Sequence, residues 1–278
     1  MRVVHDQASD GIRETGAASG EVAVAFDQVS HSFRGKPAID HVSFRIEKGE
    51  FATLIGASGC GKTTCLNAVA GELTPDTGQV KVLGGAPATG DQRIGYMFAR
   101  DSLLPWRTAA ENVAFGLESR GVNRAERRKR AAEVLDAVGL SNAHDAYPAQ
   151  LSHGMRQRVA LARTFALNAD LLLMDEPFAA LDAQTRIMLE DHLMRLWEAQ
   201  RSTVMFVTHD LAEAILLSER IFLLSASPGR ALRVYDVDLP RPRSVTRLQG
   251  MPEFHRLYEE IWSDLEEEVN LAMKRERA

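Results

Sequence analysis

The stretch Gly56-Ala57-Ser58-Gly59-Cys60-Gly61-Lys62-Thr63-Thr64 fits the pattern G-x-x-x-x-G-K-[ST]. It follows an apolar run over residues 51–55, which predicts a buried strand, and precedes residues 65–70, which predict the first turns of a helix. A phosphate-binding loop requires this order of strand, glycine-rich loop and helix. The glycines let successive backbone N–H groups point at one spot, where the helix N-terminus adds the positive end of its dipole. The stretch therefore predicts binding of a nucleoside triphosphate.

Two side chains of this loop have expected roles. Lys62 should reach the β- and γ-phosphates, and the hydroxyl of Thr63 should lie on Mg²⁺. The alternative is an ordinary glycine turn. A chain of this length would match the pattern by chance only roughly one time in a hundred, which disfavours that alternative. The strand and helix on either side make that alternative weaker still.

Composition indicates a soluble globular protein: 45% of the 278 residues are hydrophobic and 26% are charged. The net charge of −5 gives no global surface for nucleic acid, and the basic segment 124–130 predicts a solvated helix face. Cys60 and Cys65 flank Lys62 and cannot build a disulfide framework, which indicates a reducing cytosolic compartment. The apolar runs are far shorter than the ~20 residues that span a bilayer, so we expect membrane attachment only through another protein.

The second half of the chain predicts a parallel sheet. Compact, non-alternating apolar runs cover residues 171–174, 203–207 and 220–224, and a helix is predicted over about 183–200. Such runs with helices between them are typical of an α/β fold whose sheet is covered on both faces.

The other segments predict additions to this core. Residues 1–21 lack the apolar centre of a signal peptide and predict a disordered lead. Residues 22–46 predict an antiparallel β unit with a turn at Gly35-Lys36-Pro37, followed by strands at 79–83 and 94–98. Residues 107–167 predict an inserted helical subdomain. Residues 252–278 predict an acidic amphipathic helix.

Two carboxylates follow the first of the compact strands. Asp175 and Glu176 come directly after residues 171–174, and ligands of a parallel sheet sit at the carboxyl ends of its strands. Asp175 should therefore face the same crevice as Lys62 and hold Mg²⁺ through water, because hard cations take oxygen ligands. Glu176 could polarise the water that attacks the γ-phosphate. The structural alternative is a pair of solvated acids, which the upstream phosphate loop disfavours.

Two further residues have both a structural and a functional interpretation. His209 follows the next strand and should lie at the same sheet edge, within reach of a γ-phosphate, although a lone histidine is more often a hydrogen-bonded structural residue. Asp182 precedes the helix at 183–200 and could serve only as its N-cap, which is compatible with a functional role.

A second anion site is predicted where Leu151-Ser152-His153-Gly154-Met155 opens a helix. A serine and a glycine at a helix start favour anion binding. One chain with two phosphate-binding helix starts suggests a nucleotide held between two copies of the chain.

Together these motifs resemble the ATP-binding subunits of ABC transporters over about residues 22–240. Gly56–Thr64 resembles Walker A, Leu151–Met155 the LSGGQ signature, and Leu171–Glu176 Walker B with its glutamate. Ala180–Asp182 is similar to the D-loop and His209 to the switch histidine, while Phe33 falls where the family stacks an aromatic ring on adenine. The resemblance implies that two subunits close head-to-tail over two ATP. The residues that would then act in trans are Ser152, His153, Gly154, Met155 and Asp182.

Two segments resemble the ATPases of nitrate, sulfonate and taurine importers, namely Leu103–Arg107 and Leu224–Arg230. Leu103, Leu104 and Trp106 either pack inside the helical subdomain or form an apolar patch that receives a helix of the membrane permease. Both interpretations can hold together.

The chain departs from the family pattern at two places. Ala99 stands where the family usually has a glutamine that touches Mg²⁺ and the attacking water and links the site to the permease, which puts turnover and coupling in question. In the signature, His153 and Met155 replace the first glycine and the glutamine. Ser152 and Gly154 remain, so we expect the anion site to persist.

The sequence as a whole predicts the peripheral ATPase subunit of a bacterial-type ABC importer of a small solute such as nitrate, sulfonate or taurine. The expected fold is the α/β P-loop fold of ABC ATPases over residues 22–240, with antiparallel β and α-helical subdomains, followed by a linker and helix over 241–278. We expect ATP and Mg²⁺ as ligands, and Lys62, Glu176 and His209 as catalytic residues.

The expected partners are a second copy of the chain, transmembrane permease subunits at the cytoplasmic face of the cell membrane and, indirectly, a secreted or periplasmic solute-binding protein. Nucleic acid is not among them. The alternative is a soluble ABC-type ATPase with a regulatory or nucleic-acid-associated role, although the chain has no inserted coiled coil or basic arm. A P-loop nucleotide kinase would leave Ser152 and His209 without a role.

Overall fold

The computed structural model describes residues 20–179, 181–248 and 250–276. The predicted N-terminal lead therefore lies almost entirely outside the described residues. So do Ala180 of the segment that resembles the D-loop and residues 277–278 of the predicted C-terminal helix. Within the described residues, no helix is long and apolar enough to cross a membrane.

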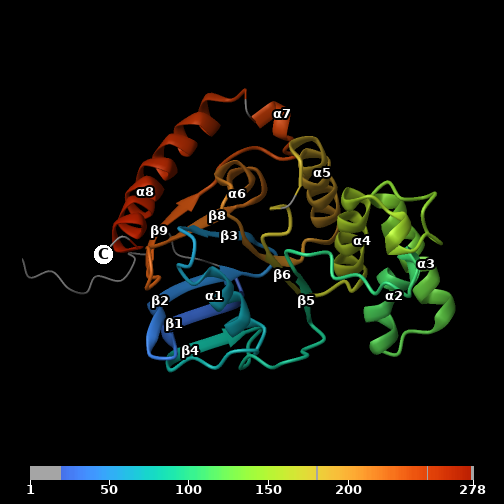
Figure 1. The fold of residues 1–278 in the computed structure, drawn as a ribbon, viewed down its shortest axis with the longest axis horizontal. Helices are drawn as coiled ribbons and strands as arrows, with labels where there is room; N and C mark the ends of the chain where they lie inside the picture. Colours follow the sequence, from blue (N-terminus) through green and yellow to red (C-terminus); the bar gives the residue numbers. More distant parts are fainter. Residues whose placement is uncertain (1–19, 180, 249, 277–278) are drawn as a thin grey trace, which may run out of the picture.

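The centre of the described structure is a sheet with the strand order β5-β6-β7-β3-β8-β9 (Figure 1). The strands are β3 (Phe51–Gly56), β5 (Ile94–Met97), β6 (Leu171–Asp175), β7 (Thr203–Val207), β8 (Arg220–Leu224) and β9 (Ala231–Asp236). The five strands β5, β6, β7, β3 and β8 are parallel to one another, and β9 pairs antiparallel with β8 at the edge. The predicted parallel-sheet core is confirmed. The edge strand β9, in which three of six residues are exposed, was not predicted.

Both faces of this sheet are buried, as the non-alternating apolar runs predicted. Along β8, Ile221 and Leu223 join one apolar core with the helices that follow α1, whereas Phe222 and Leu224 join a second core with α1 (Lys62–Val69) and the smaller sheet. Successive side chains of a strand point to opposite faces, so a strand covered on both sides must be apolar throughout.

The smaller sheet has the order β2-β1-β4, and both of its strand pairs are antiparallel. Its strands are β1 (Val22–Phe33), β2 (Lys36–Glu47) and β4 (Thr77–Val82). The turn predicted at Gly35–Pro37 was wrong by one residue, because Phe33 already pairs with Lys36. Arg34 and Gly35 alone form the turn, with φ of 51° and 77°. Two positive φ values are what a tight two-residue hairpin requires.

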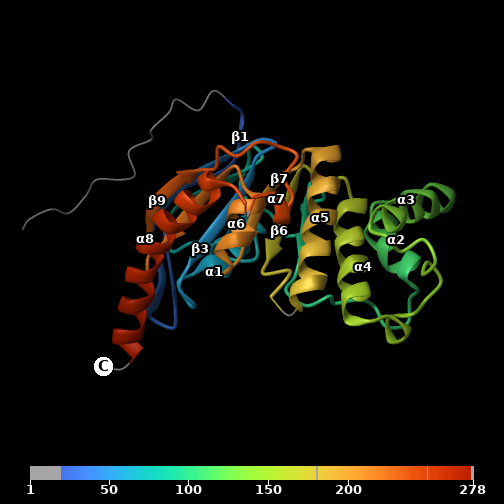
Figure 2. The same cartoon turned by 90° about the horizontal axis from the view of Figure 1, so that it is seen from above.

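Helices α2 (Ala109–Ser119), α3 (Arg124–Ala137) and α4 (His153–Ala166) fall in the predicted helical range 107–167 and pack on one another. A short 3-10 helix, η1 (Pro148–Gln150), precedes α4. Figures 1 and 2 show this group at one end of the molecule, joined to the sheet through α4 and α5 (Ala183–Gln200). The assignment of separate domain boundaries stays a prediction.

The remaining helices are α6 (Leu211–Leu217), α7 (Val245–Leu248) and α8 (Pro252–Glu276). Helix α8 runs along the opposite end of the molecule, beside β9 and α6 (Figures 1 and 2). It is amphipathic, as predicted: Phe254, Ile261 and Leu265 enter the apolar core, whereas Trp262 is 48% exposed. The hydroxyl of Tyr235 on β9 hydrogen-bonds to the carboxylate of Asp264.

Candidate nucleotide-binding site

The predicted phosphate loop connects β3 to α1 at the carboxyl edge of the parallel sheet. The ammonium group of Lys62 donates to the carbonyl oxygens of Gly56 at 2.9 Å and Ala57 at 3.2 Å, and only 7% of the residue is exposed. Gly61 is the N-cap of α1 with a φ of 96°, and a Cβ there would lie 2.4 Å from Cγ2 of Ile39. The loop can therefore close against β2 only with a glycine at this position.

Thr63 and Asp175 present neighbouring oxygen atoms at this edge. The hydroxyl of Thr63 donates to Oδ1 of Asp175 at 3.1 Å. Burial raises the pKa of the Asp175 carboxyl, the Thr63 hydrogen bond opposes that shift, and the neighbouring Glu176 adds to it. A cation placed against these two oxygens would favour the ionised carboxylate, and a hydroxyl with a carboxylate is a donor set that suits Mg²⁺.

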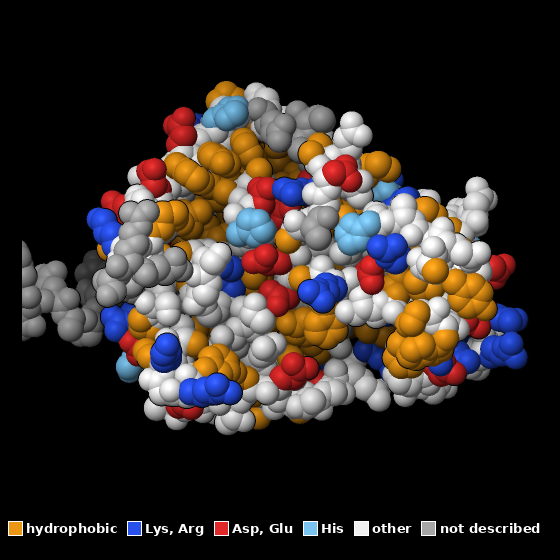
Figure 3. Space-filling model, in the orientation of Figure 1, with side chains coloured by type: hydrophobic (Ala, Val, Ile, Leu, Met, Phe, Trp, Pro, Cys, Tyr) orange, Lys and Arg blue, Asp and Glu red, His pale blue; other side chains and the backbone are white. Residues whose placement is uncertain are grey.

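Glu176 and His209 meet at the ends of adjacent strands. The parallel register pairs Asp175 with Val207, and Nδ1 of His209 lies 3.1 Å from Oε2 of Glu176. Glu176 has a φ of 46°, and its N–H donates to the carbonyl of Val207 at 2.9 Å. A non-glycine residue in this left-handed region costs on the order of 1–3 kcal/mol and persists only where the surrounding structure requires it. Figure 3 shows acidic and histidine side chains gathered in the middle of this face.

Phe33 belongs to the hairpin that touches the phosphate loop. It ends β1, is 52% exposed, and meets the ring of His31 edge-on at a centroid distance of 4.7 Å. Ile39 of the same hairpin packs against Gly61, so the hairpin that includes Phe33 is in contact with the phosphate loop. Phe33 thus presents a partly exposed aromatic ring on the hairpin that packs against the loop.

The residues predicted to act in trans form a second group. Ser152 is the N-cap of α4 and accepts a hydrogen bond from the Met155 N–H at 3.2 Å, and Asp182 caps α5 through the N–H of Thr185 at 3.0 Å. A hollow of about 260 Å³ is lined by Ser152, His153, Gly154 and Asp182 among others. The structure thus brings these four together and places Met155 in the first turn of α4.

Gly154 is required by the packing of α4 on α5. A Cβ at this position would lie 2.6 Å from Cγ2 of Thr185, a distance that real Cβ contacts do not reach. The hydroxyl of Thr185 is itself fixed by Oδ2 of Asp182 at 2.7 Å. The glycine therefore lets the start of α4 approach the start of α5.

The two groups lie apart within one chain. Helix α1, which follows the phosphate loop, and helix α4, which follows Ser152, are separated in both views of the fold (Figures 1 and 2). A nucleotide that touches both groups would have to lie between two chains.

Sequence reasoning missed the residues that hold the loop containing Ala99. Arg163 of α4 donates to the carbonyls of Ser102 and Asp101, both at 2.8 Å. Nε of Arg156 donates to the Asp101 carboxylate at 2.9 Å, and Gln157 donates to the Ala99 carbonyl at 3.3 Å. The loop is therefore fixed to the helix that begins at the predicted signature.

Sequence reasoning also missed Asn112, which holds the turn that presents Trp106. Asn112 is fully buried, accepts from the Leu104 N–H at 2.7 Å, and donates to the carbonyls of Leu104, Arg107 and Thr108 at 2.9–3.1 Å. Trp106 is 71% exposed, whereas Leu103 packs against the core. Figure 3 shows hydrophobic side chains on the surface over α2. The segment thus contributes both to the core and to an exposed patch.

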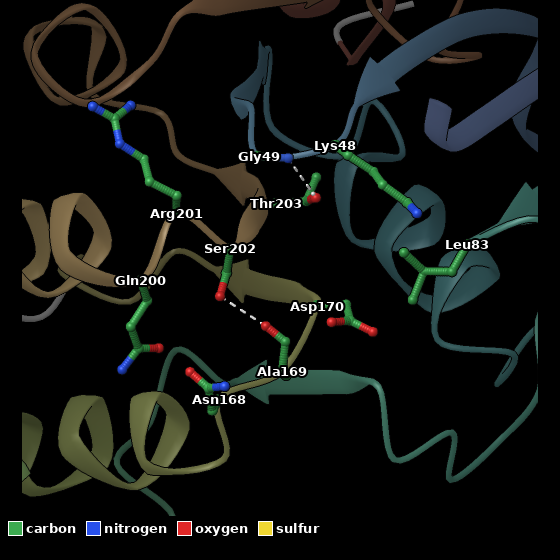
Figure 4. A pocket seen from close by; sticks show the side chains of 10 residues that line it. All are labelled: Lys48, Gly49, Leu83, Asn168, Ala169, Asp170, Gln200, Arg201, Ser202 and Thr203. Atoms are coloured by element: carbon green, nitrogen blue, oxygen red, sulfur yellow. Dashed lines mark hydrogen bonds between the residues drawn. The ribbon is translucent and has the colours of Figure 1, made fainter. Parts of the chain in front are cut away.

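A separate hollow of about 270 Å³ lies at the opposite edge of the sheet, where β6, β7 and β3 begin (Figure 4). Its walls include Lys48, Asp170 and Arg201, and the Ser202 hydroxyl donates to the Ala169 carbonyl at 2.7 Å. Parallel sheets bind ligands at the carboxyl ends of their strands. This hollow is at the amino ends and is not the nucleotide site.

Comparison with known proteins agrees with this geometry. The family described as ABC transporter matches residues 39–179. The taurine import ATP-binding protein TauB of Rhizobium johnstonii is 43% identical over 228 residues, which cover 81% of this chain and 87% of that protein. The nitrate import ATP-binding protein NrtD of a Synechocystis species is 40% identical over 231 residues, with coverage of 81% and 87%.

A solved structure of the ATP-binding cassette MJ0796, described as dimeric, in a post-hydrolysis state and bound to ADP and Pi, has a TM-score of 0.67 and 33% identity to this chain. The match covers 78% of this chain and 100% of that one.

Proposed function

The chain belongs to the ABC transporter family, and from this premise we propose that it is the ATP-hydrolysing subunit of a membrane importer of a small solute. The observation that carries the proposal is the grouping of Thr63, Asp175, Glu176 and His209 beside the phosphate loop at one sheet edge. Relatives named for taurine and nitrate import suggest a small anionic or zwitterionic solute. An ATPase subunit does not contact the solute, so the residues that select it lie on other chains.

We assign the phosphates of ATP to the loop from Gly56 to Thr64. The backbone N–H groups of the loop and of the N-terminus of α1 would donate hydrogen bonds to the phosphate oxygens. Lys62 would exchange its bonds to Gly56 and Ala57 for bonds to the β- and γ-phosphates. Thr63 and Asp175 would hold Mg²⁺, which would supply positive charge against the phosphate oxygens. Phe33 would stack on the adenine.

Glu176 and His209 would act on the water and the γ-phosphate. The Glu176 carboxylate would accept a proton from the attacking water as the bond between the γ-phosphorus and the bridging oxygen breaks. A hydrogen bond between His209 and Glu176, whose atoms Nδ1 and Oε2 lie 3.1 Å apart, would fix the orientation of that carboxylate. His209, 58% exposed at its side chain, can also reach toward the transferred phosphoryl group.

The separation of the two groups of residues supports a homodimer. Ser152, His153, Gly154, Met155 and Asp182 of one copy would close on the ATP held by the phosphate loop of the other. Two copies arranged head-to-tail complete two equal sites, which is a closed arrangement with twofold symmetry.

The exposed Trp106, beside the half-buried Leu104, supports a permease partner. An exposed tryptophan held by a buried asparagine is an ordered apolar surface, and such surfaces receive a partner helix. The subunit would therefore be peripheral, attached to transmembrane permease subunits at the cytoplasmic face, and would serve a solute-binding protein only indirectly.

The test is size-exclusion chromatography of Glu176→Gln with ATP and Mg²⁺. Glutamine keeps the shape of the side chain but cannot accept the proton, so we expect ATP to remain intact and to trap a dimer. Glu260→Gln, which neutralises an exposed carboxylate of α8, serves as the matched control and should hydrolyse ATP like the natural chain. A Glu176→Gln variant that binds ATP but stays monomeric would contradict the proposed dimer, and one that hydrolyses ATP at the natural rate would contradict the role of Glu176.

A further inference from the structure

A third cavity lies behind the loop that carries His209, between α5, α6 and the segment of α7 and α8. Its volume is about 170 Å³, below the roughly 300–1,000 Å³ of pockets for drug-sized ligands. Its polar walls include Arg186, Glu190, Asp210 and Glu213, and its apolar walls include Leu248 and Phe254. No step of the proposed hydrolysis uses these side chains.

Glu190 is the feature that sets this cavity apart. The residue is only 4% exposed, it lines the cavity, and within the described residues no hydrogen bond or ion pair engages its carboxyl group. Among the described residues that line the cavity, the cation is Arg186, which donates to Asp210 at 2.7 Å and lies 3.6 Å from Glu213, while its Nε makes no hydrogen bond. Buried carboxyl groups in proteins are normally hydrogen-bonded or paired. Glu190 is therefore a polar group that faces the cavity with its binding capacity unused.

In the part of the chain that the structure describes, the three carboxyl groups of Glu190, Asp210 and Glu213 that line the cavity accompany one guanidinium group, that of Arg186. Burial, followed by the charges of Glu213 and Asp210, raises the pKa of Glu190 to about 8, with a smaller contribution from Asp191 and opposition from Arg186. The pKa of Glu213 is raised to about 7, mainly by burial. From α7 and α8, the groups that line the cavity are the apolar Leu248 and Phe254.

We propose that this cavity binds a small organic cation, namely a primary ammonium group on a short hydrocarbon chain. The ammonium group has donors for the carboxyl oxygens of Glu190 and Glu213, and its charge matches the excess of carboxyl groups over Arg186. Leu216, Leu248 and Phe254 suit the hydrocarbon part, and an aromatic ring also attracts a cation. These apolar walls favour an amine over a bare metal ion, which would need oxygen ligands on all sides.

The occupant would lie against the loop that carries His209. Asp210, which lines the cavity, is the N-cap of α6, and Glu213 accepts a hydrogen bond from the Thr208 hydroxyl at 2.6 Å. A cation that draws Glu213 or Asp210 toward it would shift the residues on both sides of His209. The ligand should therefore change the rate of ATP hydrolysis. That consequence rests on the proposed function, whereas the binding itself does not.

The test is calorimetric titration of the full chain with n-butylammonium chloride at pH 8.5 and pH 6.5, beside n-butanol and calcium chloride. We expect butylammonium to bind at one site, with an affinity at least about tenfold weaker at pH 6.5, because Glu190 must lose its proton to pair with the ligand. Titrations at pH 6.5 in buffers of different ionisation enthalpy should show release of a proton. Butanol and calcium should not bind there.

Glu190→Gln should abolish the binding and its pH dependence, whereas Glu260→Gln should leave both unchanged. Equal binding of butanol, binding of calcium instead of butylammonium, or butylammonium binding that survives Glu190→Gln would each overturn the proposal. ATP hydrolysis measured with and without butylammonium separates the two proposals. A chain that binds the amine but shows no turnover under any condition would contradict the proposed function and leave the cation site standing.

Discussion

Replacing Glu190 by glutamine should raise the free energy of unfolding in alkaline solution and leave it nearly unchanged in acid. Burial and the charges of Glu213 and Asp210 raise the pKa of Glu190 from 4.5 to about 8. The folded chain therefore holds this proton more tightly than the unfolded chain, and the free energy of unfolding falls as the pH rises from about 4.5 to about 8. Glutamine has nearly the same shape and carries no charge at any pH, so the variant escapes this loss.

The size of the effect follows from the pKa of this residue. A rise of ~3.5 units at 1.36 kcal/mol each gives about 5 kcal/mol as an upper limit. Part of the shift comes from Glu213, which is itself partly protonated near neutral pH because its own pKa is raised to about 7. We therefore expect the variant to be more stable than the natural chain by about 2–4 kcal/mol at pH 8.5, and by less than about 0.5 kcal/mol at pH 4.5.

Urea denaturation followed by tryptophan fluorescence at the two pH values measures this difference, and Glu260→Gln is the control for loss of a negative charge on the surface. The control should change the free energy of unfolding by less than about 0.5 kcal/mol at either pH. If Glu190→Gln differs from the natural chain by the same amount at both pH values, or is the less stable chain at pH 8.5, then burial does not hold this carboxyl neutral.

Three further substitutions test the nucleotide site and the exposed patch. Lys62→Ala should abolish tight ATP binding because the phosphates lose their main cation, and a titration with unchanged affinity would refute the phosphate-loop assignment. Changing Leu104 and Trp106 together to serine should weaken co-purification with the permease more than it lowers the melting temperature; a sharp fall in melting temperature with precipitation would instead indicate core packing. Ala99→Gln should raise hydrolysis by the isolated subunit less than about tenfold, with a larger effect on stimulation in the permease complex. If only Ala99→Gln hydrolyses ATP, the natural chain is a binding-only subunit.

The sequence could predict those elements whose signals are local. The helix predicted over 183–200 has those bounds in the structure, because Asp182 caps its first turn and Arg201 ends it in the left-handed conformation with a φ of 53°. The compact apolar runs predicted β6, β7 and β8, because a strand buried on both faces has no exposed position. The meeting of Asp175, Glu176 and His209 then follows from the rule that parallel strands end at one edge.

What the sequence could not predict depends on contacts between distant segments. Buried and exposed residues do not alternate regularly along β9, which lies at the sheet edge, so its sequence has no clear hydrophobic pattern. Asn112 is bonded to backbone groups of a preceding turn, and nothing in its neighbourhood of sequence distinguishes it from a surface asparagine. Glu190 occupies a helix in a chain rich in acidic residues, and only the approach of α6 and α8 makes its carboxyl buried.

The loop at Ala99 shows how the structure alters an inference drawn from a missing side chain. A glutamine at this position would have two roles, as a ligand at the nucleotide and as a connection from the nucleotide to the permease. Alanine removes the first, and a water molecule can replace a ligand in the Mg²⁺ shell because this ion retains several waters. The second does not depend on the side chain alone, because Arg163 and Gln157 fix the backbone of this loop to α4. Helix α4 begins at Ser152, which would face the ATP of the second copy. The bonds between this loop and α4 would therefore give movement of the surface at Trp106 a second route to the nucleotide, beside the one that a glutamine side chain would supply.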